Sequence, residues 1–283
     1  MAADRTHRTW AEIDLDAIAH NLREIRRHTD RTAQIMAVVK ADAYGHGAPQ
    51  VAREALAHGA SWLAVAMLEE AIELRRKDIK APILILSDNE PECAETVVAC
   101  DVRQAVSSYD MARRLSEAAG RLGKRARIHL KIDTGMGRIG FSPEQAPAEA
   151  ERIARLDGIE IEGIFTHFAV ADESSEDADR YTERQYRTFC ETCERIERER
   201  HIHIPLRHAA NSAAILRFPH MHLDLVRAGI ILYGLWPSED LKACGADLRP
   251  VMTLKSAISH VKSVEPGSSL SYGRTYCTHE PAV

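Results

Sequence analysis

Lys40 directly follows the apolar run of residues 36–39 and has the clearest chemical potential in this sequence. A short apolar run predicts a buried β-strand, so the lysine is expected at the mouth of a barrel or sheet. A neutral lysine amine attacks an aldehyde to form a Schiff base, and burial favours the neutral amine. Tyr44 can offer a hydroxyl to an anion, and Gly45 and Gly47 allow a tight bend. The alternative is a surface lysine whose amine reaches solvent.

Strand-like and helix-like segments alternate along the chain. The predicted strands are residues 35–39, 62–66, 82–86, 104–106, 126–132, 159–165, 206–209 and 223–226. The predicted helices are residues 15–28, 48–58, 68–77, 92–99, 110–122, 143–156 and 181–200. Repeated β-then-α units imply parallel strands with right-handed crossovers. We therefore predict an α/β fold with a (β/α)8 TIM-like barrel, preceded by a strand at 9–15 and interrupted by an acidic loop at 172–179.

The pattern changes after the predicted barrel. Residues 251–264 alternate like an antiparallel strand, and residues 266–268 indicate a turn. We predict a barrel at 9–235, with an N-terminal extension at 1–8 and the start of a β-rich C-terminal domain at 236–283. About fifty residues are few for an independent domain, so we expect a partner to complete it or the chain to be truncated there.

Composition excludes several classes of protein. The net charge of −5 argues against a general nucleic-acid binder, and no apolar run is long enough for a membrane span. The N-terminus lacks the apolar core of a signal peptide, and six scattered cysteines fit free thiols in the cytoplasm. Cys190 and Cys193 form one Cys-x-x-Cys pair in a charged helical stretch. No second pair accompanies them, so no metal site is expected.

Active sites of such barrels form at the C-terminal ends of the strands. Five of the predicted strands end in polar or glycine-rich segments. The residues of interest there are Lys40, Lys131, Arg138, His167, His208, Asn211, Ser212, Arg227, Gly229 and Ile230. Scattered surface polarity would not place these groups at one mouth, so we predict a single site.

A phosphate is expected after the seventh and eighth strands. Ser212 can offer a hydroxyl, and Gly229 and Ile230 can offer backbone N–H groups. For Asn211 and Ser212 the alternative is an ordinary helix cap. Position after the seventh strand favours the phosphate site.

Two arginines of this set have specific uses. Arg227 would be buried and needs a partner, either a carboxylate such as Asp224 or the ring nitrogen of a bound heterocycle. Arg138 lies among glycines and suits a carboxylate, unless it is a solvated loop residue. His167 could be a core histidine or could stack beside a planar ring. Tyr272, in the β-rich tail, could be a packing residue.

The motifs at residues 9–15, 37–47, 131–140 and 271–273, taken in order, resemble the alanine racemase family of fold-type III enzymes, which bind pyridoxal 5'-phosphate (PLP). The resemblance covers nearly the entire chain. It implies a PLP-dependent racemase that interconverts L- and D-alanine and supplies D-alanine for peptidoglycan. It also implies a cytoplasmic homodimer with two shared active sites.

The resemblance also implies a role for each matched residue. Lys40 carries PLP and serves as the base on the D-alanine side, and Tyr272 of the opposite subunit serves the L-alanine side and contacts His167. The implied cofactor shell further comprises Tyr44, Ser212, Gly229 and Ile230 at the phosphate, Arg227 at the pyridine nitrogen, His208 beside Arg227, and Asn211. Arg138 orients the substrate carboxylate, and Lys131 matches a lysine that is often carbamylated and positions Arg138.

The sequence departs from the family at its end, where a further Gly-Tyr motif and a substrate-entry region are not found. Three alternatives follow. The chain is an alanine racemase, a serine or broad-specificity racemase, or a PLP-binding but catalytically incomplete fragment. A fold-III decarboxylase is disfavoured because its cofactor usually faces an acidic group, where this chain has Arg227.

Overall fold

The computed structural model describes residues 8–283, so the predicted extension at 1–8 lies outside the described residues except for Arg8. Contacts divide the chain into two compact units. The larger comprises Asp14–Val251, and the smaller comprises Met252–Val283 with residues up to Ile13. Within the described chain, no helix is both long and apolar enough to cross a membrane.

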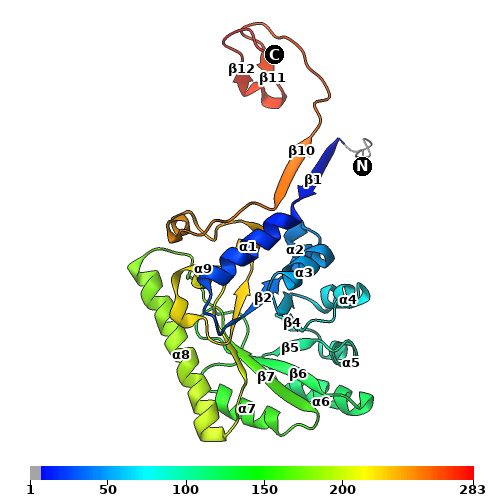
Figure 1. The fold of residues 1–283 in the computed structure, drawn as a ribbon, viewed down its shortest axis with the longest axis vertical. Coiled ribbons are helices and arrows are strands. Elements are labelled where there is room, and N and C mark those ends of the chain that lie inside the picture. Colours follow the sequence, from blue (N-terminus) through cyan, green and yellow to red (C-terminus); the bar gives the residue numbers. More distant parts are fainter. Residues whose placement is uncertain (1–7) are drawn as a thin grey trace. The chain divides into compact units, whose positions relative to one another are not determined.

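The larger unit is built on eight parallel strands (Figure 1). They are β2 (Gln34–Val38), β3 (Trp62–Val65), β4 (Ile83–Ile85), β5 (Arg103–Val106), β6 (Ala126–Lys131), β7 (Ile159–Phe165), β8 (Leu206–His208) and β9 (Leu225–Ala228). The order is β8-β7-β6-β5-β4-β3-β2-β9, so the last strand pairs with the first. The predicted α/β barrel is thereby confirmed.

The seam between β8 and β9 is closed by individual hydrogen bonds instead of a ladder. The N–H of Asp224 donates to the carbonyl of Arg207 at 3.1 Å, and that of Arg227 donates to the carbonyl of Ala210 at 3.0 Å. The Asp224 carboxylate accepts the N–H of Arg207 at 2.8 Å. Asp224 therefore helps to close the barrel.

Alternate residues of the strands fill the barrel interior, as the two-residue period of a strand requires. One buried cluster consists of Met36, Val38, Trp62, Ala64, Leu84 and Leu225. This packing holds the strand ends in fixed positions around one mouth.

Helices connect the strands and lie outside them in Figure 1. They are α1 (Leu15–His28), α2 (Lys40–Gly45), α3 (Ala48–Ala57), α4 (Leu68–Arg76), α5 (Ala94–Ala99), α6 (Tyr109–Leu122), α7 (Ala146–Ala154), α8 (Glu176–Arg200) and α9 (Ser212–Arg217). Short 3-10 segments are η1 (Pro91–Cys93), η2 (Pro219–Met221), η3 (Ile230–Tyr233) and η4 (Glu239–Cys244). The apolar period of residues 15–28 gives the bounds of α1 correctly because Asp14 caps its N-terminus, accepting the N–H of Ala17.

Part of the predicted acidic loop at 172–179 is helical. Helix α8 begins at Glu176, where the Ser175 hydroxyl accepts the N–H of Ala178. The acidic residues of its first turn stabilise the helix start through the helix dipole. The short α2 and α9 were not predicted as helices.

In the smaller unit, β1 (Thr9–Ile13) pairs antiparallel with β10 (Met252–Ser256), and β11 (Ser269–Leu270) pairs with β12 (Tyr276–Cys277). The predicted strand at 251–264 is thus too long: it ends at Ser256, and Val264 makes only an isolated bridge to Ala282. Alternation alone overestimated this strand because the residues after Ser256 are largely exposed.

Asn21 joins α1 to the segments that follow the last strand. Its side-chain amide donates to the carbonyls of Leu232 (3.1 Å) and Arg249 (2.8 Å) and accepts the N–H of Arg249 at 2.7 Å. Asn21 is fully buried, so water could not form hydrogen bonds to these backbone groups if its side chain were removed.

We predict that Asn21→Leu lowers the free energy of unfolding by about 3 kcal/mol, because it leaves buried backbone groups unpaired. Urea unfolding followed by circular dichroism measures the change. Arg23→Ala, on the exposed face of the same helix, is the control and should change stability by less than about 0.5 kcal/mol. Equal effects of the two substitutions would contradict the role given to Asn21.

Candidate functional site

The larger unit contains a cavity of about 560 Å³ at the C-terminal ends of its strands. Among its lining residues are the predicted site residues Lys40, Tyr44, Lys131, Arg138, His167, Asn211, Ser212, Arg227, Gly229 and Ile230. Cavities of this size accommodate a cofactor or small ligand. The structure thus brings together ten of the twelve predicted residues, with His208 just behind Arg227.

Lys40 begins a left-handed turn. Ala41, Asp42, Ala43 and Tyr44 all have φ between 51° and 55° and ψ between 38° and 51°. Each such residue costs roughly 1–2 kcal/mol relative to a right-handed conformation. Strain of this kind persists only where the surroundings stabilise it, and it is concentrated at functional sites.

Hydrogen bonds from the surrounding chain hold this turn. The Asp42 carboxylate accepts the N–H of Ala48 at 2.7 Å, and its carbonyl accepts the N–H of Gly47 at 3.0 Å. Glu70 accepts the N–H of Ala41 and also that of Ala66 at 2.7 Å. Asp42 and Glu70 were missed in the sequence, although Glu70 sits at the third position of a helix, where a carboxylate commonly caps.

An anion cradle lies next to the turn. The N–H of Gly229 donates to the Ser212 hydroxyl at 3.0 Å. A Cβ at Gly229 would lie 3.4 Å from that hydroxyl and 3.8 Å from the Tyr44 hydroxyl, so a side chain would enter the space between them. The Gly229 N–H holds the Ser212 hydroxyl in place, and two hydroxyls that face such a space suit a phosphate.

Asn211 does serve as a helix cap, which was the alternative to a ligand role. Its side chain accepts the N–H of Ala214 at 3.0 Å at the start of α9. It also lines the cavity. The cap fixes where Ser212 presents its hydroxyl.

Arg227 lies inside β9, two residues beyond its start, and is 3% exposed. Its guanidinium donates to the carbonyls of Thr166 (2.8 Å) and Ala209 (2.9 Å) and to Nδ1 of His208 (2.9 Å). Within residues 8–283 no carboxylate pairs with it, and Asp224 bonds to Arg207 instead. Burial lowers the pKa of Arg227 to about 9, so it stays charged at neutral pH.

His167 lies beside Arg227, with Nδ1 accepting from Nη2 at 3.2 Å. Burial and then the cations Arg227, Arg138, Lys131 and Lys40 lower the pKa of His167 to about 3. His167 is therefore neutral at physiological pH, with its proton on Nε2.

Arg138 is carried by a loop that Asp133 organises. The Asp133 carboxylate accepts the N–H groups of Gly137 (3.0 Å) and Arg138 (3.2 Å). Gly140 has φ +131°, and a Cβ there would lie 2.6 Å from the N of Asp133, so only glycine fits. The exposed Arg138 side chain is presented to the cavity by this loop.

Lys131 ends β6 and is 2% exposed, with Nζ donating to the carbonyl of Ile132 at 2.8 Å. Burial lowers its pKa to about 8, although the Asp133 carboxylate opposes the shift. A substantial fraction of this lysine is the neutral amine near physiological pH.

Tyr272 does not line the cavity and, unlike His208, does not lie behind a residue that does. It belongs to the smaller unit, where it starts the 3-10 segment η5 (Tyr272–Arg274), and its side chain is 99% exposed. The described residues contain no cluster of metal-ligating side chains, and all six cysteines are free.

Comparison with known proteins gives the family. The model of the alanine racemase N-terminal domain matches residues 13–237. The chain belongs to the alanine racemase family. It is 50% identical over 268 residues to an alanine racemase of Desulforamulus reducens, covering 94% of this chain and 71% of that protein. It is 46% identical to the Clostridium tetani enzyme, covering 97% and 70%.

Solved alanine racemases have the same fold. That of Clostridium difficile 630 superimposes with a TM-score of 0.91 at 42% identity, covering 98% of this chain and 72% of that one. That of Bacillus anthracis with bound L-Ala-P gives 0.86 at 36% identity, covering 98% and 71%. The predicted alanine racemase family and its enzymatic class, an isomerase, are thereby confirmed.

We predict that Lys131→Met stabilises the cofactor-free protein at pH 7, by up to about 3 kcal/mol, and much less at pH 10.5. The folded-state pKa lies below the unfolded value, so burial of the charged form opposes folding fully below pH 8. This penalty fades as pH rises from about 8 to 10.5. Urea unfolding in CO2-free buffer measures both differences.

Lys77→Met, at an exposed lysine, is the matched control and should show no such pH dependence. If Lys131→Met changes the free energy of unfolding by the same amount at pH 7 and at pH 10.5, the lowered pKa of Lys131 would be contradicted.

Proposed function

We propose that this chain catalyses the PLP-dependent racemisation of L- and D-alanine by two-base proton transfer at Cα. The observation that supports this most is a cavity that combines an amine at Lys40 with a buried guanidinium at Arg227 that lacks a carboxylate. The relatives of this chain are alanine racemases, and related structures are a complex with cycloserine and an enzyme with bound L-Ala-P.

The residues fit PLP. The space between the Tyr44 and Ser212 hydroxyls and the N–H of Gly229 would hold the phosphate, with Ile230 following on η3. Arg227 would face the pyridine nitrogen, with His208, His167 and Asn211 around it. When bound through its aldehyde to Lys40, PLP supplies delocalisation of the negative charge that develops at the substrate Cα.

Arg227 sets the protonation at the ring nitrogen. A guanidinium has donors and no acceptor, so it would hydrogen-bond to an unprotonated nitrogen. An unprotonated ring would withdraw electron density less strongly, which would limit side reactions of a long-lived carbanion.

Racemisation needs a proton acceptor on each face of Cα. Lys40 would move the proton on the D-alanine side, and Tyr272 would do so on the L-alanine side. We propose that Tyr272 is contributed by the second subunit of a homodimer and contacts His167, so the two active sites are shared.

Arg138 would bind the substrate carboxylate through its guanidinium. Lys131 would position Arg138, and the neutral amine that its lowered pKa provides is the form that carbamylation requires. Supply of D-alanine for peptidoglycan in the cytoplasm is the physiological role that follows. The division into a barrel at 9–235 and flanking segments at 1–8 and 236–283 stays a prediction.

Two alternatives use the same cavity. A serine or broad-specificity racemase would differ in pocket width. PLP binding without turnover would follow if Tyr272, which is exposed in the single chain, does not reach the cavity of a second subunit. Cα deuterium exchange and chirality, measured on L- and D-alanine and on L- and D-serine with the PLP-loaded chain, separate these alternatives. Absence of PLP-dependent interconversion of the alanine isomers would contradict the proposed function.

We predict that Lys40→Ala abolishes the visible absorbance of bound PLP and the borohydride-stable attachment of the cofactor, because the proposed function places the Lys40 amine at the aldehyde, whereas the Lys131 amine donates to the carbonyl of Ile132. Absorbance spectroscopy and mass spectrometry after reduction measure this. Lys77→Ala should retain both signals. Attachment that persists in Lys40→Ala would refute the assignment.

We predict that Tyr272→Phe slows Cα hydrogen exchange from L-alanine far more than from D-alanine, since only one face loses its base. Single-isomer exchange in deuterated buffer, followed by NMR, measures both rates. Tyr276→Phe, a nearby exposed tyrosine, is the control. An equal loss for both isomers would argue against two bases.

A further inference from the structure

A chain of polar side chains runs through the barrel from Arg227 to Glu162. Nη1 of Arg227 lies 2.9 Å from Nδ1 of His208, and Nε2 of His208 lies 2.8 Å from Nδ1 of His129. Nε2 of His129 then lies 3.5 Å from the Glu162 carboxylate. Arg103, at the start of β5, donates to the same carboxylate at 2.9 Å and 3.3 Å. None of His129, Glu162 and Arg103 was singled out in the sequence.

The two ends of this chain favour the same direction of hydrogen bonding. Arginine only donates, so Nδ1 of His208 must accept, and a neutral His208 then carries its proton on Nε2. That proton is donated to Nδ1 of His129, which leaves the proton of His129 on Nε2, facing Glu162. The Glu162 carboxylate lies 3.5 Å from that nitrogen, which is longer than an ordinary hydrogen bond, so it favours the proton there by its charge.

Both histidines are neutral. Each is fully buried, and burial lowers the pKa of both: the charge of Arg227 adds to the shift at His208, whereas Glu162 opposes it at His129 without reversing it. Burial alone would raise the pKa of Glu162, but the contact with His129 and the hydrogen bonds and charge of Arg103 outweigh it and lower the pKa to about 2. The chain therefore has fixed charges only at its two ends.

Packing leaves the rings no other position. Phe165 stacks on His208 with ring planes 2° apart and centroids 4.8 Å apart, and Trp62 meets His129 edge-on. Gly163 lies against His129, and a Cβ there would be 2.4 Å from Nδ1. Rotation of either imidazole would meet these side chains.

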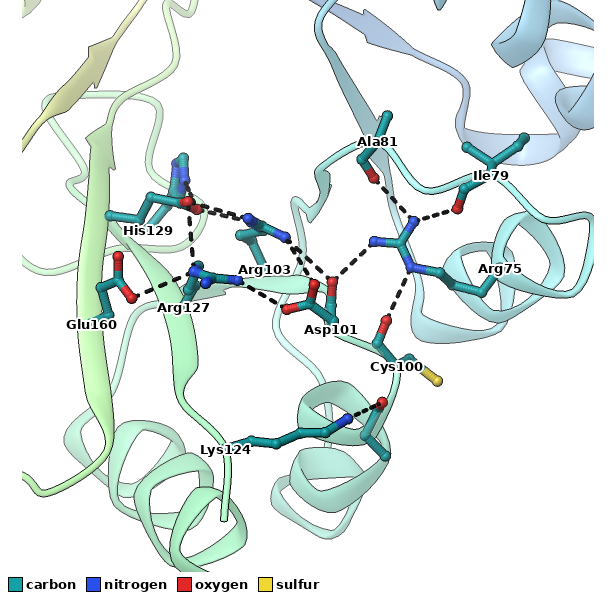
Figure 2. A network of polar contacts seen from close by, with 12 residues as sticks. Arg75, Ile79, Ala81, Cys100, Asp101, Arg103, Lys124, Arg127, His129 and Glu160 are labelled. Atoms are coloured by element: carbon teal, nitrogen blue, oxygen red, sulfur yellow. Dashed lines mark hydrogen bonds and ion pairs between the residues drawn. The ribbon is translucent and has the colours of Figure 1, made fainter. Parts of the chain in front are cut away.

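Glu162 differs from the other carboxylates of this region. Figure 2 shows Glu160 joined to Arg127, which also contacts Asp101, in a network of which His129 and Arg103 are also members. Glu160 lies two residues before Glu162 on the same strand and makes no contact with either histidine. It provides a matched position without the connection to Arg227.

We propose that Glu162 is a positioning residue for Arg227, because through His129 and His208 it fixes the tautomers that keep an acceptor turned toward the guanidinium. The role toward the cofactor rests on the proposed function, in which Arg227 faces the ring nitrogen. With a neutral group at position 162, Arg227 alone would favour this proton order. Forms with a proton on Nδ1 of His129 would then become populated, and in these forms His208 turns an N–H toward Arg227, so that two donors oppose each other.

The test is 15N NMR of histidine side chains in the cofactor-free protein, which reports tautomers directly. The unmodified chain should show His129 and His208 neutral with protons on Nε2. Glu162→Gln should lose this single-tautomer pattern at both residues, whereas Glu160→Gln should keep it. Arg103→Met removes the ion pair of Glu162 but keeps its carboxylate, so it should keep the pattern even if it lowers stability.

A purely structural role predicts a different result. Glu162→Gln and Arg103→Met would then lower the stability to a similar extent, and neither would change the tautomers. That result would overturn the proposal. A protonated Nδ1 on His208 in the unmodified chain would also overturn it, and this measurement does not depend on whether any variant folds.

After addition of PLP, Glu162→Gln should shift the cofactor absorbance and reduce kcat severalfold, and Arg103→Met should not shift the absorbance. Failure of PLP binding in all variants, with the tautomer pattern as predicted, would count against the proposed function and leave the tautomer control of Arg227 supported. Normal absorbance and kcat in Glu162→Gln would overturn the positioning role alone.

Discussion

The buried charge of Arg227 is the constraint on which much of this barrel depends. A guanidinium at 3% exposure, without a carboxylate beside it, is stable only if fixed dipoles replace water. The carbonyls of Thr166 and Ala209 and the Nδ1 atoms of two histidines provide them. The ends of β7, β8 and β9 must therefore keep their spacing, and the apolar interior packing maintains it.

The second constraint is the strained turn after Lys40. The chain cannot leave β2 in an ordinary conformation and still present Lys40 and Tyr44 to one cavity. Asp42 and Glu70 satisfy the backbone groups that this turn exposes. The site thus combines a rigidly held side chain at Arg227 with a strained backbone after Lys40. Packing elsewhere in the barrel compensates the free-energy cost of this strain.

The barrel and most of its site could be predicted from sequence because strand-end residues and apolar runs are local signals. Ser175 followed by acidic residues is also a local signal, and it could have given the true start of α8. The left-handed turn could not be found in this way, since Ala41 and Ala43 have no preference for that conformation. His129 was missed because its partner, His208, lies 79 residues away in sequence, and Glu162 was missed because its importance comes from its contact with His129.

The left-handed turn also inverts the usual tolerance of sequence to change. At Ala41 and Ala43, glycine would relieve backbone strain instead of adding flexibility at a cost, whereas a β-branched residue would be the worst replacement. A deep mutational scan of this segment would therefore rank substitutions in nearly the reverse of their order in a right-handed helix. Glycine would be the best-tolerated replacement for the fold, but it would also make the backbone beside Lys40 more flexible.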